Sequence, residues 1–355
     1  MEIRFEQAAQ LKAKPAADAK LGFGKLFTDY MFVMDYDREI GWHDARIVPF
    51  APIPMHPACT VLHYGSEIFE GLKAYRREDG EVQLFRPMEN VRRMNMSAER
   101  LCLPQLDEEF ALEALKKFVS VEKDWVPSAP GTSLYLRPFM MGMDEYLGVH
   151  AASKAMFVII ASPSGSYYAA GINPVGIMIE TEDVRAVRGG TGYAKCGGNY
   201  AASIRAGERA EKKGFSQVLW LDGVERKYIE EVGAMNIMFK IAGKVITPAL
   251  LGSVLPGITR KSCIELRKNW GYEVEARKIS IDELIEAMQN GTLEEAWGTG
   301  TAAVVSPVGK LAYEGGEYIV NNNEIGSLTQ RLYDELTGIQ WGKKEDKFGW
   351  VEAVK

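Results

Sequence analysis

One lysine could do chemistry, because it lies in a loop where few side chains surround it. The loop reads Arg188-Gly-Gly-Thr-Gly-Tyr-Ala-Lys195-Cys-Gly-Gly-Asn-Tyr200. A phosphate-binding P-loop would need Gly-Lys-Ser/Thr, whereas Lys195 lies between Ala194 and Cys196. A dinucleotide-binding G-x-G-x-x-G pattern would need glycine where Lys195 stands. The pattern therefore indicates a lysine whose own amine reacts, most often by forming an imine with a carbonyl cofactor or substrate.

If the carbonyl compound is pyridoxal phosphate, the chain must also bind a phosphate group. The segment Leu255-Pro-Gly-Ile-Thr259 opens a predicted helix, and the free backbone amides of Ile258 and Thr259 would face an anion there. A second small-residue loop, 298–303, can add backbone amides and the Thr301 hydroxyl. The alternative is that both segments are ordinary turns.

The 298–303 loop also fits the loosened dinucleotide pattern G-x-G-x-x-A. Residues Val304-Val-Ser-Pro307 follow it and predict a strand, whereas a dinucleotide site needs a helix at that point. A nicotinamide dehydrogenase is therefore the less favoured class of enzyme.

Such a cofactor also needs a carboxylate beside its ring nitrogen and a donor to its phenolic oxygen. Glu230 and Glu231 are candidates for the carboxylate; a solvated strand end is the simpler interpretation, and spacing does not decide between the two acids. Tyr200 is the candidate donor, with packing as the alternative. Arg93 lies away from the apolar face of its helix. A solvated side chain is therefore the default interpretation, and contact with a phosphate is the more specific hypothesis. Cys196 has no suitable histidine near it in sequence, which favours packing over a nucleophilic role.

Helices and strands must position these groups. Apolar periodicity predicts helices over 89–100, 107–125, 199–213, 280–291 and 327–337, and the segment 255–261 opens a further helix that runs to Gly271. Strands are predicted over 132–137, 155–161, 175–180, 217–221 and 235–241, with Asp222-Gly223 and Ala242-Gly243-Lys244 as hairpin turns. Expected helix boundaries are the caps Asn199 and Ser280 and the terminating glycines Gly214, Gly291 and Gly338.

The chain length predicts two domains, and the mixture of predicted helices and strands makes the protein α+β. The chain has 355 residues, of which 46% are apolar and 25% charged, as in ordinary globular proteins. Between Pro163 and Pro174 it has no charged residue and is rich in Ser, Gly, Ala and Tyr. We therefore expect a smaller N-terminal α/β domain over 1–163, a linker over 164–174 and a larger C-terminal domain, carrying the lysine, over 175–355.

Charge and cysteine usage argue against several partners. The net charge of −6 is spread along the chain without a basic block, which disfavours nucleic acid. The four cysteines are far apart and the four histidines show no ligand spacing, so we expect neither a disulfide framework nor a metal site. Charged residues at the N-terminus interrupt any secretory signal, and the longest apolar run, 155–161, is too short to cross a membrane. We expect a cytoplasmic protein.

Several motifs, in a fixed order between Gly22 and Trp341, resemble one family. They are Phe23-Gly-Lys-Leu-Phe-Thr-Asp29, Phe69-Glu-Gly-Leu-Lys-Ala-Tyr75, Ser133-Leu-Tyr-Leu-Arg-Pro138, the lysine loop, Glu231-Val-Gly233, Leu255-Pro-Gly-Ile-Thr-Arg260 and 298–307. The chain resembles the branched-chain amino acid aminotransferases, which are pyridoxal-phosphate enzymes of fold type IV and relatives of D-amino acid aminotransferase. Within them it is similar to the longer subgroup that includes the animal enzymes. The resemblance implies a C-terminal domain with a pseudo-barrel of strands and flanking helices.

The resemblance also implies residue roles. Lys195 matches the Schiff-base lysine, which also moves the substrate α-proton. The other cofactor ligands match Arg93, Tyr200, Glu231, Ile258, Thr259 and Thr301. The substrate pocket matches Phe23, Tyr64, Phe69, Tyr135, Arg137, Tyr167, Ala234 and Ala302.

Within these sets, Glu231 matches the partner of the ring nitrogen and Tyr200 the donor to the phenolic oxygen. Arg137 matches an arginine for the side-chain carboxylate of glutamate, and Tyr64 a residue that reaches in from the partner subunit. The backbone amides of Ala234 and Ala302 match positions that take the substrate carboxylate.

The implied activity is reversible transfer of the amino group from L-leucine, L-isoleucine or L-valine to 2-oxoglutarate by a homodimer. A D-amino acid aminotransferase or an aminodeoxychorismate lyase of the same fold is the alternative, although the long N-terminal region with the 69–75 motif favours the first. The animal enzymes carry a redox-active C-x-x-C pair where this chain has Ala303 and Ser306, so that regulation is not expected.

Overall fold

The computed structural model describes residues 1–165 and 172–355, which form two compact units. Unit 1 holds the described residues before 166 together with Ala194–Gly197 and Gly338–Lys355. Unit 2 holds residues 172–193 and Gly198–Thr337. The chain therefore does not divide at one linker alone, because the short segment that carries Lys195 belongs to unit 1.

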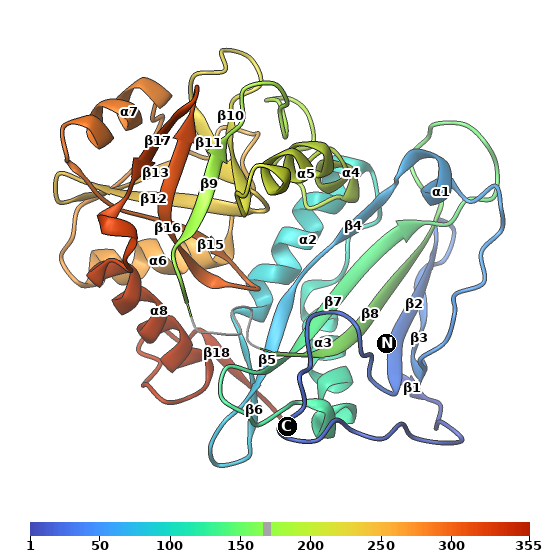
Figure 1. Cartoon of the computed structure of the whole chain (residues 1–355). Helices are drawn as coiled ribbons and strands as arrows, with labels where there is room; N and C mark the ends of the chain where they lie inside the picture. Colours follow the sequence, from blue (N-terminus) through green and yellow to red (C-terminus); the bar gives the residue numbers. More distant parts are fainter. Residues whose placement is uncertain (166–171) are drawn as a thin grey trace. The chain divides into compact units, whose positions relative to one another are not determined.

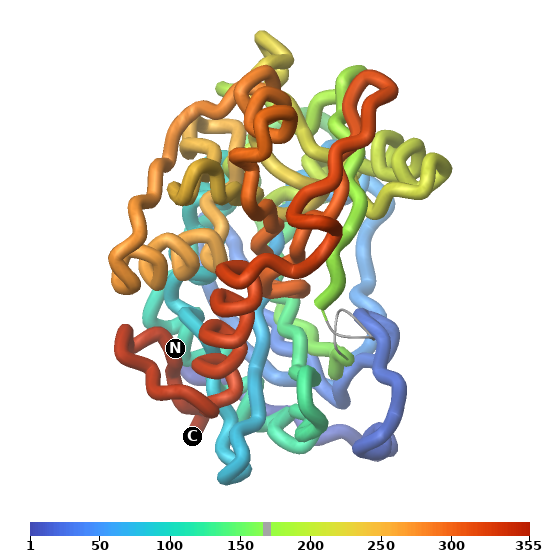
Figure 2. The backbone as a smooth tube through the Cα atoms, turned by 60° about the vertical axis from the view of Figure 1, so that its left-hand side comes forward, coloured from blue at the N-terminus to red at the C-terminus, as the bar shows by residue number. Residues whose placement is uncertain are grey.

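Unit 1 is built on a nine-stranded sheet. Its order is β1 (Arg4–Phe5), β3 (Gly41–Pro49), β2 (Tyr30–Asp37), β8 (Lys154–Ser164), β7 (Ser133–Gly142), β5 (Leu72–Arg76), β6 (Val82–Phe85) and β18 (Val351–Val354), with β4 (Glu67–Phe69) paired to β7. Strand β8 is buried on both faces over most of its length, which suits its continuous apolar run. The C-terminal strand β18 (dark red) lies antiparallel beside β6 (cyan), as Figures 1 and 2 show.

The helices of unit 1 begin where local chemistry predicts. They are α1 (Thr60–Tyr64), α2 (Pro87–Leu101) and α3 (Glu108–Val121), with a 3₁₀ turn at Lys123–Trp125. The Asp107 side chain accepts a hydrogen bond of 2.8 Å from the amide of Phe110 and so caps α3. Proline at the first position of α2 needs no amide partner. The predicted helix over 89–100 is confirmed and buries Val91, Met94 and Ala98.

Unit 2 contains a closed barrel. Its strands follow the order β11 (Ile229–Val232), β10 (Gln217–Leu221), β9 (Val175–Ile179), β16 (Val304–Tyr313), β15 (Leu293–Gly300) and β12 (Met235–Ile241). Strand β11 also pairs with β12, which closes the ring and confirms the expected barrel. Beyond β12 the sheet continues through β13 (Lys244–Pro248) and β14 (Val274–Arg277), and β17 (Gly316–Ile319) pairs with β16.

The remaining helices are α4 (Gly197–Ala201), α5 (Ile204–Lys212), α6 (Ile258–Asn269), α7 (Ile281–Gln289) and α8 (Ser327–Gln340), with a 3₁₀ turn at Asn321–Asn323. The expected cap at Ser280 is confirmed, because its hydroxyl accepts from the amide of Glu283 at 3.1 Å. Among the helices in the described parts of the chain, none is both long and apolar enough to span a bilayer.

The prediction that Asn199 caps one helix over 199–213 is wrong. Asn199 lies inside α4. The helix ends at Ala201, and a separate helix, α5, begins at Ile204. The Asn199 side chain instead donates to the carbonyl of Thr191 and accepts from the Thr191 hydroxyl, each at 2.8 Å. This tie across the lysine loop replaces the local cap, since asparagine can satisfy either set of groups.

Two further boundaries differ from expectation. The turn predicted at Asp222-Gly223 is a longer loop over 222–228, because the Asp222 carboxylate gathers several backbone amides of that loop. Helix α8 runs past Gly338 to Gln340. There the Gln83 side-chain amide donates to the carbonyls of Ile339 and Gln340 at 3.0 and 2.9 Å, which satisfies groups that a helix end leaves free.

Candidate active site

The backbone of Lys195 is fixed on both sides within unit 1. Its amide donates to the hydroxyl of Ser97 on α2 at 2.9 Å, and its carbonyl accepts from the amide of Phe69 at the end of β4 at 2.9 Å. Its Nζ lies 4.8 Å from the centre of the Phe69 ring. The predicted reactive amine is therefore held beside an aromatic face.

Arg93 and Glu70 form a buried ion pair near this lysine. Arg93 Nε lies 2.8 Å from one Glu70 carboxylate oxygen and Nη2 lies 2.8 Å from the other. Burial alone would raise the pKa of Glu70, but the charges of Arg93 and Lys195 and a hydrogen bond from Asn90 hold it below its ordinary value. The default interpretation of Arg93 as a solvated residue is wrong, because its side chain is only 8% exposed. Two-point pairing leaves the guanidinium in one orientation.

Three aromatic residues predicted for the substrate pocket, Phe23, Phe69 and Tyr135, lie in unit 1. The rings of Phe23 and Tyr135 meet edge to face with centres 4.8 Å apart. The Arg137 guanidinium lies 4.7 Å from the centre of the Phe69 ring and donates to the Tyr135 hydroxyl at 3.1 Å. A side chain at Gly71 would collide with that hydroxyl, so glycine is required there. The result is an apolar surface with the Arg137 cation at its margin.

The other two aromatic residues predicted for the pocket are Tyr64 and Tyr167. Tyr167 is outside the described residues. Tyr64 ends α1, is 44% exposed, and its hydroxyl accepts from the amide of Gly148 at 2.9 Å. Its expected role in a partner subunit stays a prediction.

In unit 2, the two neighbouring acids of β11 have different surroundings. Glu231 Oε1 accepts from the amide of Leu255 at 2.8 Å and from the Asn236 side chain at 3.3 Å, while Oε2 lies 3.0 Å from Arg185 Nε. Glu230 accepts from the Ser253 hydroxyl, and burial raises its pKa. The acid matched to the ring nitrogen is thus the one with a cation and an amide directly against its carboxylate.

Arg185 connects three elements of unit 2. Besides Glu231, it donates to the carbonyl of Gly192 in the lysine loop at 3.0 Å and to the carbonyl of Ser253, which precedes α6. Its side chain is 7% exposed. Residue 192 has to be glycine, because a side chain there would strike the Ser253 carbonyl. Arg185 therefore holds the loop, the approach to α6 and the β11 acid together.

The start of α6 lies beside Glu231. Ile258 and Thr259 form its first turn and are buried, and the amides of a first turn have no partner within their own helix. The Asn236 side chain donates to the carbonyl of Leu255 at 2.9 Å, which joins this segment to β12. The predicted anion cradle therefore lies against the predicted carboxylate.

Two turns at one end of the barrel hold Ala234 and the pair Thr301 and Ala302. Strand register pairs Asn236 with Thr299, so the β11–β12 turn that holds Ala234 lies at the same edge as the β15–β16 turn that holds Thr301 and Ala302. The strand expected to follow residue 303 is present as β16. Tyr200 lies half-buried in α4, and the Thr191–Asn199 pair ties that helix to the loop.

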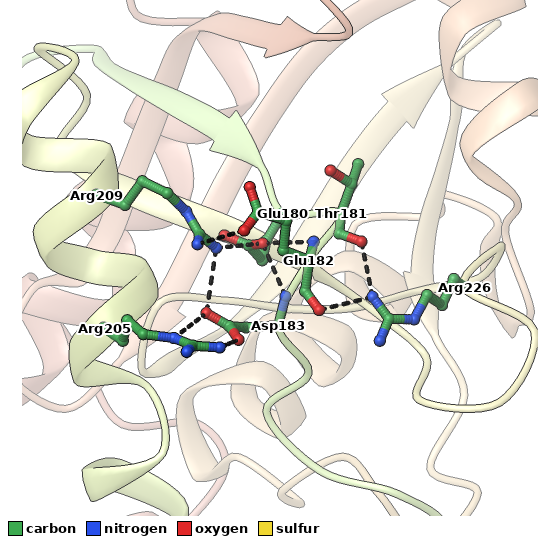
Figure 3. A network of polar contacts seen from close by, with 7 residues as sticks. All are labelled: Glu180, Thr181, Glu182, Asp183, Arg205, Arg209 and Arg226. Atoms are coloured by element: carbon green, nitrogen blue, oxygen red, sulfur yellow. Dashed lines mark hydrogen bonds and ion pairs between the residues drawn. The ribbon is translucent and has the colours of Figure 1, made fainter.

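A polar network in unit 2 joins the chain before the lysine loop to the helix after it (Figure 3). It consists of Glu180, Thr181, Glu182, Asp183, Arg205, Arg209 and Arg226. Arg209 of α5 donates to Glu180 at 2.6 Å and to Asp183 at 3.1 Å. Because these groups flank residues 184–203, the network closes that segment at its base and reduces the entropy cost of holding it in one shape.

Sequence reasoning missed two charged residues of these groups. Glu70 belongs to the quoted 69–75 motif, but its pairing with Arg93 had no local signal. Arg185 meets Glu231 from a distant part of the chain, and neither residue predicts the other. The four cysteines, all among the described residues, are unpaired, and Cys196 packs in the core of unit 1, as expected.

Known proteins are similar to this chain in sequence. A model of the family "Amino-transferase class IV" matches residues 67–311. Branched-chain-amino-acid aminotransferase 2 of Bacillus subtilis (strain 168) is 56% identical over 352 residues, which cover 99% of this chain and 97% of that protein.

Solved structures are similar in fold. The Escherichia coli branched-chain amino acid aminotransferase has a TM-score of 0.76 at 27% identity, covering 92% of this chain and 99% of that one. The T.th. branched-chain amino acid aminotransferase complexed with N-(5'-phosphopyridoxyl)-L-glutamate has a TM-score of 0.76 at 26% identity, covering 95% of this chain and 99% of that one. The α+β fold of type IV expected from the sequence is confirmed.

Proposed function

The chain belongs to the class IV aminotransferase family, and from that premise we propose that it is a branched-chain amino acid aminotransferase. It would transfer the amino group reversibly from L-leucine, L-isoleucine or L-valine to 2-oxoglutarate, giving L-glutamate and a branched-chain 2-oxo acid. The observation that carries this proposal is the 56% identity, over 99% of the chain, to a Bacillus subtilis protein of that name.

Pyridoxal 5'-phosphate is the proposed cofactor, and the residues fit it by their chemistry. A lysine amine beside an aromatic ring suits its aldehyde, and a helix start with unpaired first-turn amides suits its phosphate. A buried carboxylate, Glu231, suits a protonated ring nitrogen, since opposite charges stabilise each other where water is excluded. The related T.th. structure holds a phosphopyridoxyl group, which supports the same choice.

The proposed ligands are Lys195, Arg93, Tyr200, Glu231, Ile258, Thr259 and Thr301. When bound, the cofactor supplies an electron-poor ring that accepts the electron pair released at the substrate α-carbon. Lys195 Nζ takes the proton from that carbon as a general base and returns it as a general acid. Glu231 would keep the ring nitrogen protonated by its negative charge, and the Tyr200 hydroxyl would donate to the phenolic oxygen. The ion pair with Glu70 would hold the Arg93 side chain in one orientation for contact with the cofactor phosphate.

The pocket composition supports aliphatic substrates. Phe23, Phe69 and Tyr135, with Tyr167 as a further proposed wall, offer apolar surface at roughly 25 cal/mol per Å² buried. One methylene changes binding weakly, so leucine, isoleucine and valine would all be accepted. Arg137 would pair with the side-chain carboxylate of glutamate. The amides of Ala234 and Ala302 would take the substrate α-carboxylate.

We also propose a cytoplasmic homodimer. The exposed Tyr64 at the end of α1 supports a role for that ring in the partner's pocket. Four unpaired cysteines suit a reducing compartment.

The absorption spectrum of the purified protein tests the proposal. A yellow protein should lose its long-wavelength absorbance with L-leucine and regain it with 2-oxoglutarate. D-alanine should produce no such change, and a D-amino acid aminotransferase would show the reverse preference. A colourless protein that responds to NAD would contradict the proposal outright.

A further inference from the structure

Glu67 places a carboxylate on the same sheet face as the aromatic and cationic residues of unit 1. In the pairing of β4 with β7, Glu67 faces Met141 and Phe69 faces Phe139. Side chains at alternate positions of a strand share one face, so Glu67 and Phe69 lie on the face that also carries Arg137. Arg137 packs over the Phe69 ring at 4.7 Å. A carboxylate and a guanidinium therefore share the sheet face that carries this aromatic side chain.

The position of Glu67 is fixed by the backbone next to the reactive lysine. The amide of Gly197 donates to Glu67 Oε1, and a side chain at residue 197 would collide with that carboxylate. Burial raises the pKa of Glu67, while the Gly197 amide and the Arg137 charge act in the opposite direction. The carboxylate is thus attracted by the guanidinium that the proposed function assigns to glutamate.

We propose that Glu67 is a specificity-determining residue, a built-in counter-charge that competes with the side-chain carboxylate of glutamate and 2-oxoglutarate for Arg137. This inference rests on the proposed function, in which one pocket accepts both an aliphatic and an anionic side chain. The proposed role of Glu67 includes no contact with the substrate α-carbon or with Lys195 Nζ.

The physical reason lies in the cost of an unpaired charge near apolar surface. When a leucine side chain fills the pocket, Arg137 would lose solvent without gaining an anion, and the Glu67 charge offsets that loss. When a dicarboxylic substrate enters, its side-chain carboxylate is attracted less strongly by Arg137. Glu67 already neutralises part of the Arg137 charge and repels the substrate carboxylate. One fixed carboxylate therefore tilts the pocket toward aliphatic substrates.

Substitution Glu67→Gln separates charge from structure. Glutamine keeps the side-chain oxygen that accepts from Gly197 and nearly the same volume, but removes the negative charge. The KM for 2-oxoglutarate should fall by about 3- to 10-fold, as expected for loss of a partly solvated charge repulsion. The KM for L-leucine should stay the same or rise by no more than about 3-fold. Glu39→Gln, an exposed acid in the β2–β3 loop of the same unit, is the matched control and should change neither value.

Binding without turnover provides a second readout. Calorimetric titration of the cofactor-loaded protein should show tighter binding of glutarate to the Glu67→Gln variant, with isovalerate unchanged or weaker. In an Arg137→Gln background, Glu67→Gln should no longer improve glutarate binding, because the competition needs both charges.

The outcomes are distinct. If KM changed equally for 2-oxoglutarate and L-leucine, Glu67 would only support the backbone at Gly197. If neither KM changed, Glu67 would have no role in selectivity. Either result overturns the inference. Wild-type protein that fails to transaminate L-leucine with 2-oxoglutarate would overturn the proposed function instead. Active wild type with the predicted split supports both.

Discussion

Each unit buries one arginine–glutamate pair beside residues matched to the cofactor, but the two pairs are built differently. In unit 1, Arg93 meets both oxygens of Glu70 at 2.8 Å, so the two charges satisfy each other. In unit 2, Arg185 Nε meets one oxygen of Glu231 at 3.0 Å, and Nη2 donates to two backbone carbonyls. The first pair is joined at two points, whereas the second is joined at one and its arginine also binds two loop carbonyls.

The difference suggests different purposes. A two-point fork fixes the direction of Arg93, which suits the proposed contact of this side chain with the cofactor phosphate. In the arrangement at Arg185, the Glu231 carboxylate has two amide donors as well as a cation, so several partners share one buried charge. Removing one partner should therefore have a larger structural effect in unit 1 than in unit 2.

The largest effect is expected for Arg93→Leu. This change leaves the Glu70 charge buried without the Arg93 guanidinium. Loss of one member of a buried ion pair should lower the free energy of unfolding by about 3–5 kcal/mol. Urea unfolding of the cofactor-free protein measures the loss. The double variant Arg93→Leu with Glu70→Gln should recover part of it, because no unpaired charge remains. A single variant as stable as the wild type would show that the pair is not closed as described.

A smaller effect is expected for Arg185→Leu. Glu231 keeps its amide contacts, so we expect a loss of about 2 kcal/mol in unfolding free energy. Release of the cofactor, followed by its absorbance on dilution, should become faster, since the lysine loop loses its tie at Gly192. Arg188→Leu is the matched control, because Arg188 is an exposed arginine of the same loop. Equal effects of the two substitutions would count against Arg185 as a positioning residue.

The smallest effect is expected in the network of Figure 3, which contrasts with both buried pairs. Arg205 is 78% exposed and pairs with Asp183, so Arg205→Ala should lower the unfolding temperature only slightly. Arg209 is 22% exposed and meets three acids, so Arg209→Ala should cost more. Thermal unfolding at low and high salt checks this order. The cost of Arg205→Ala should shrink with added salt, and a salt-independent cost would contradict a solvent-screened pair.

Local patterns predicted much of this molecule. Strands over 217–221 and 235–241 were predicted with the observed ends, because apolar runs between turn residues carry their own signal. Asn199 misled because asparagine can cap a helix or bridge a loop, and only the folded chain brings Thr191 within its reach.

The site was predictable where one segment carries the chemistry. Lys195 in its glycine loop and the start of α6 are examples, since each can be recognised from consecutive residues. Arg185, Glu70 and Glu67 could not be recognised in this way. Their roles depend on contacts with residues far away in sequence, and a charged residue on its own does not reveal its partner.

Reduction of the cofactor-loaded protein with borohydride, followed by peptide mapping, tests the central claim most directly. The account predicts a pyridoxyl group on the Lys195 side chain, and none on the same peptide of a Lys195→Ala variant. A modified lysine elsewhere, or an unmodified Lys195 peptide from fully loaded protein, would contradict it.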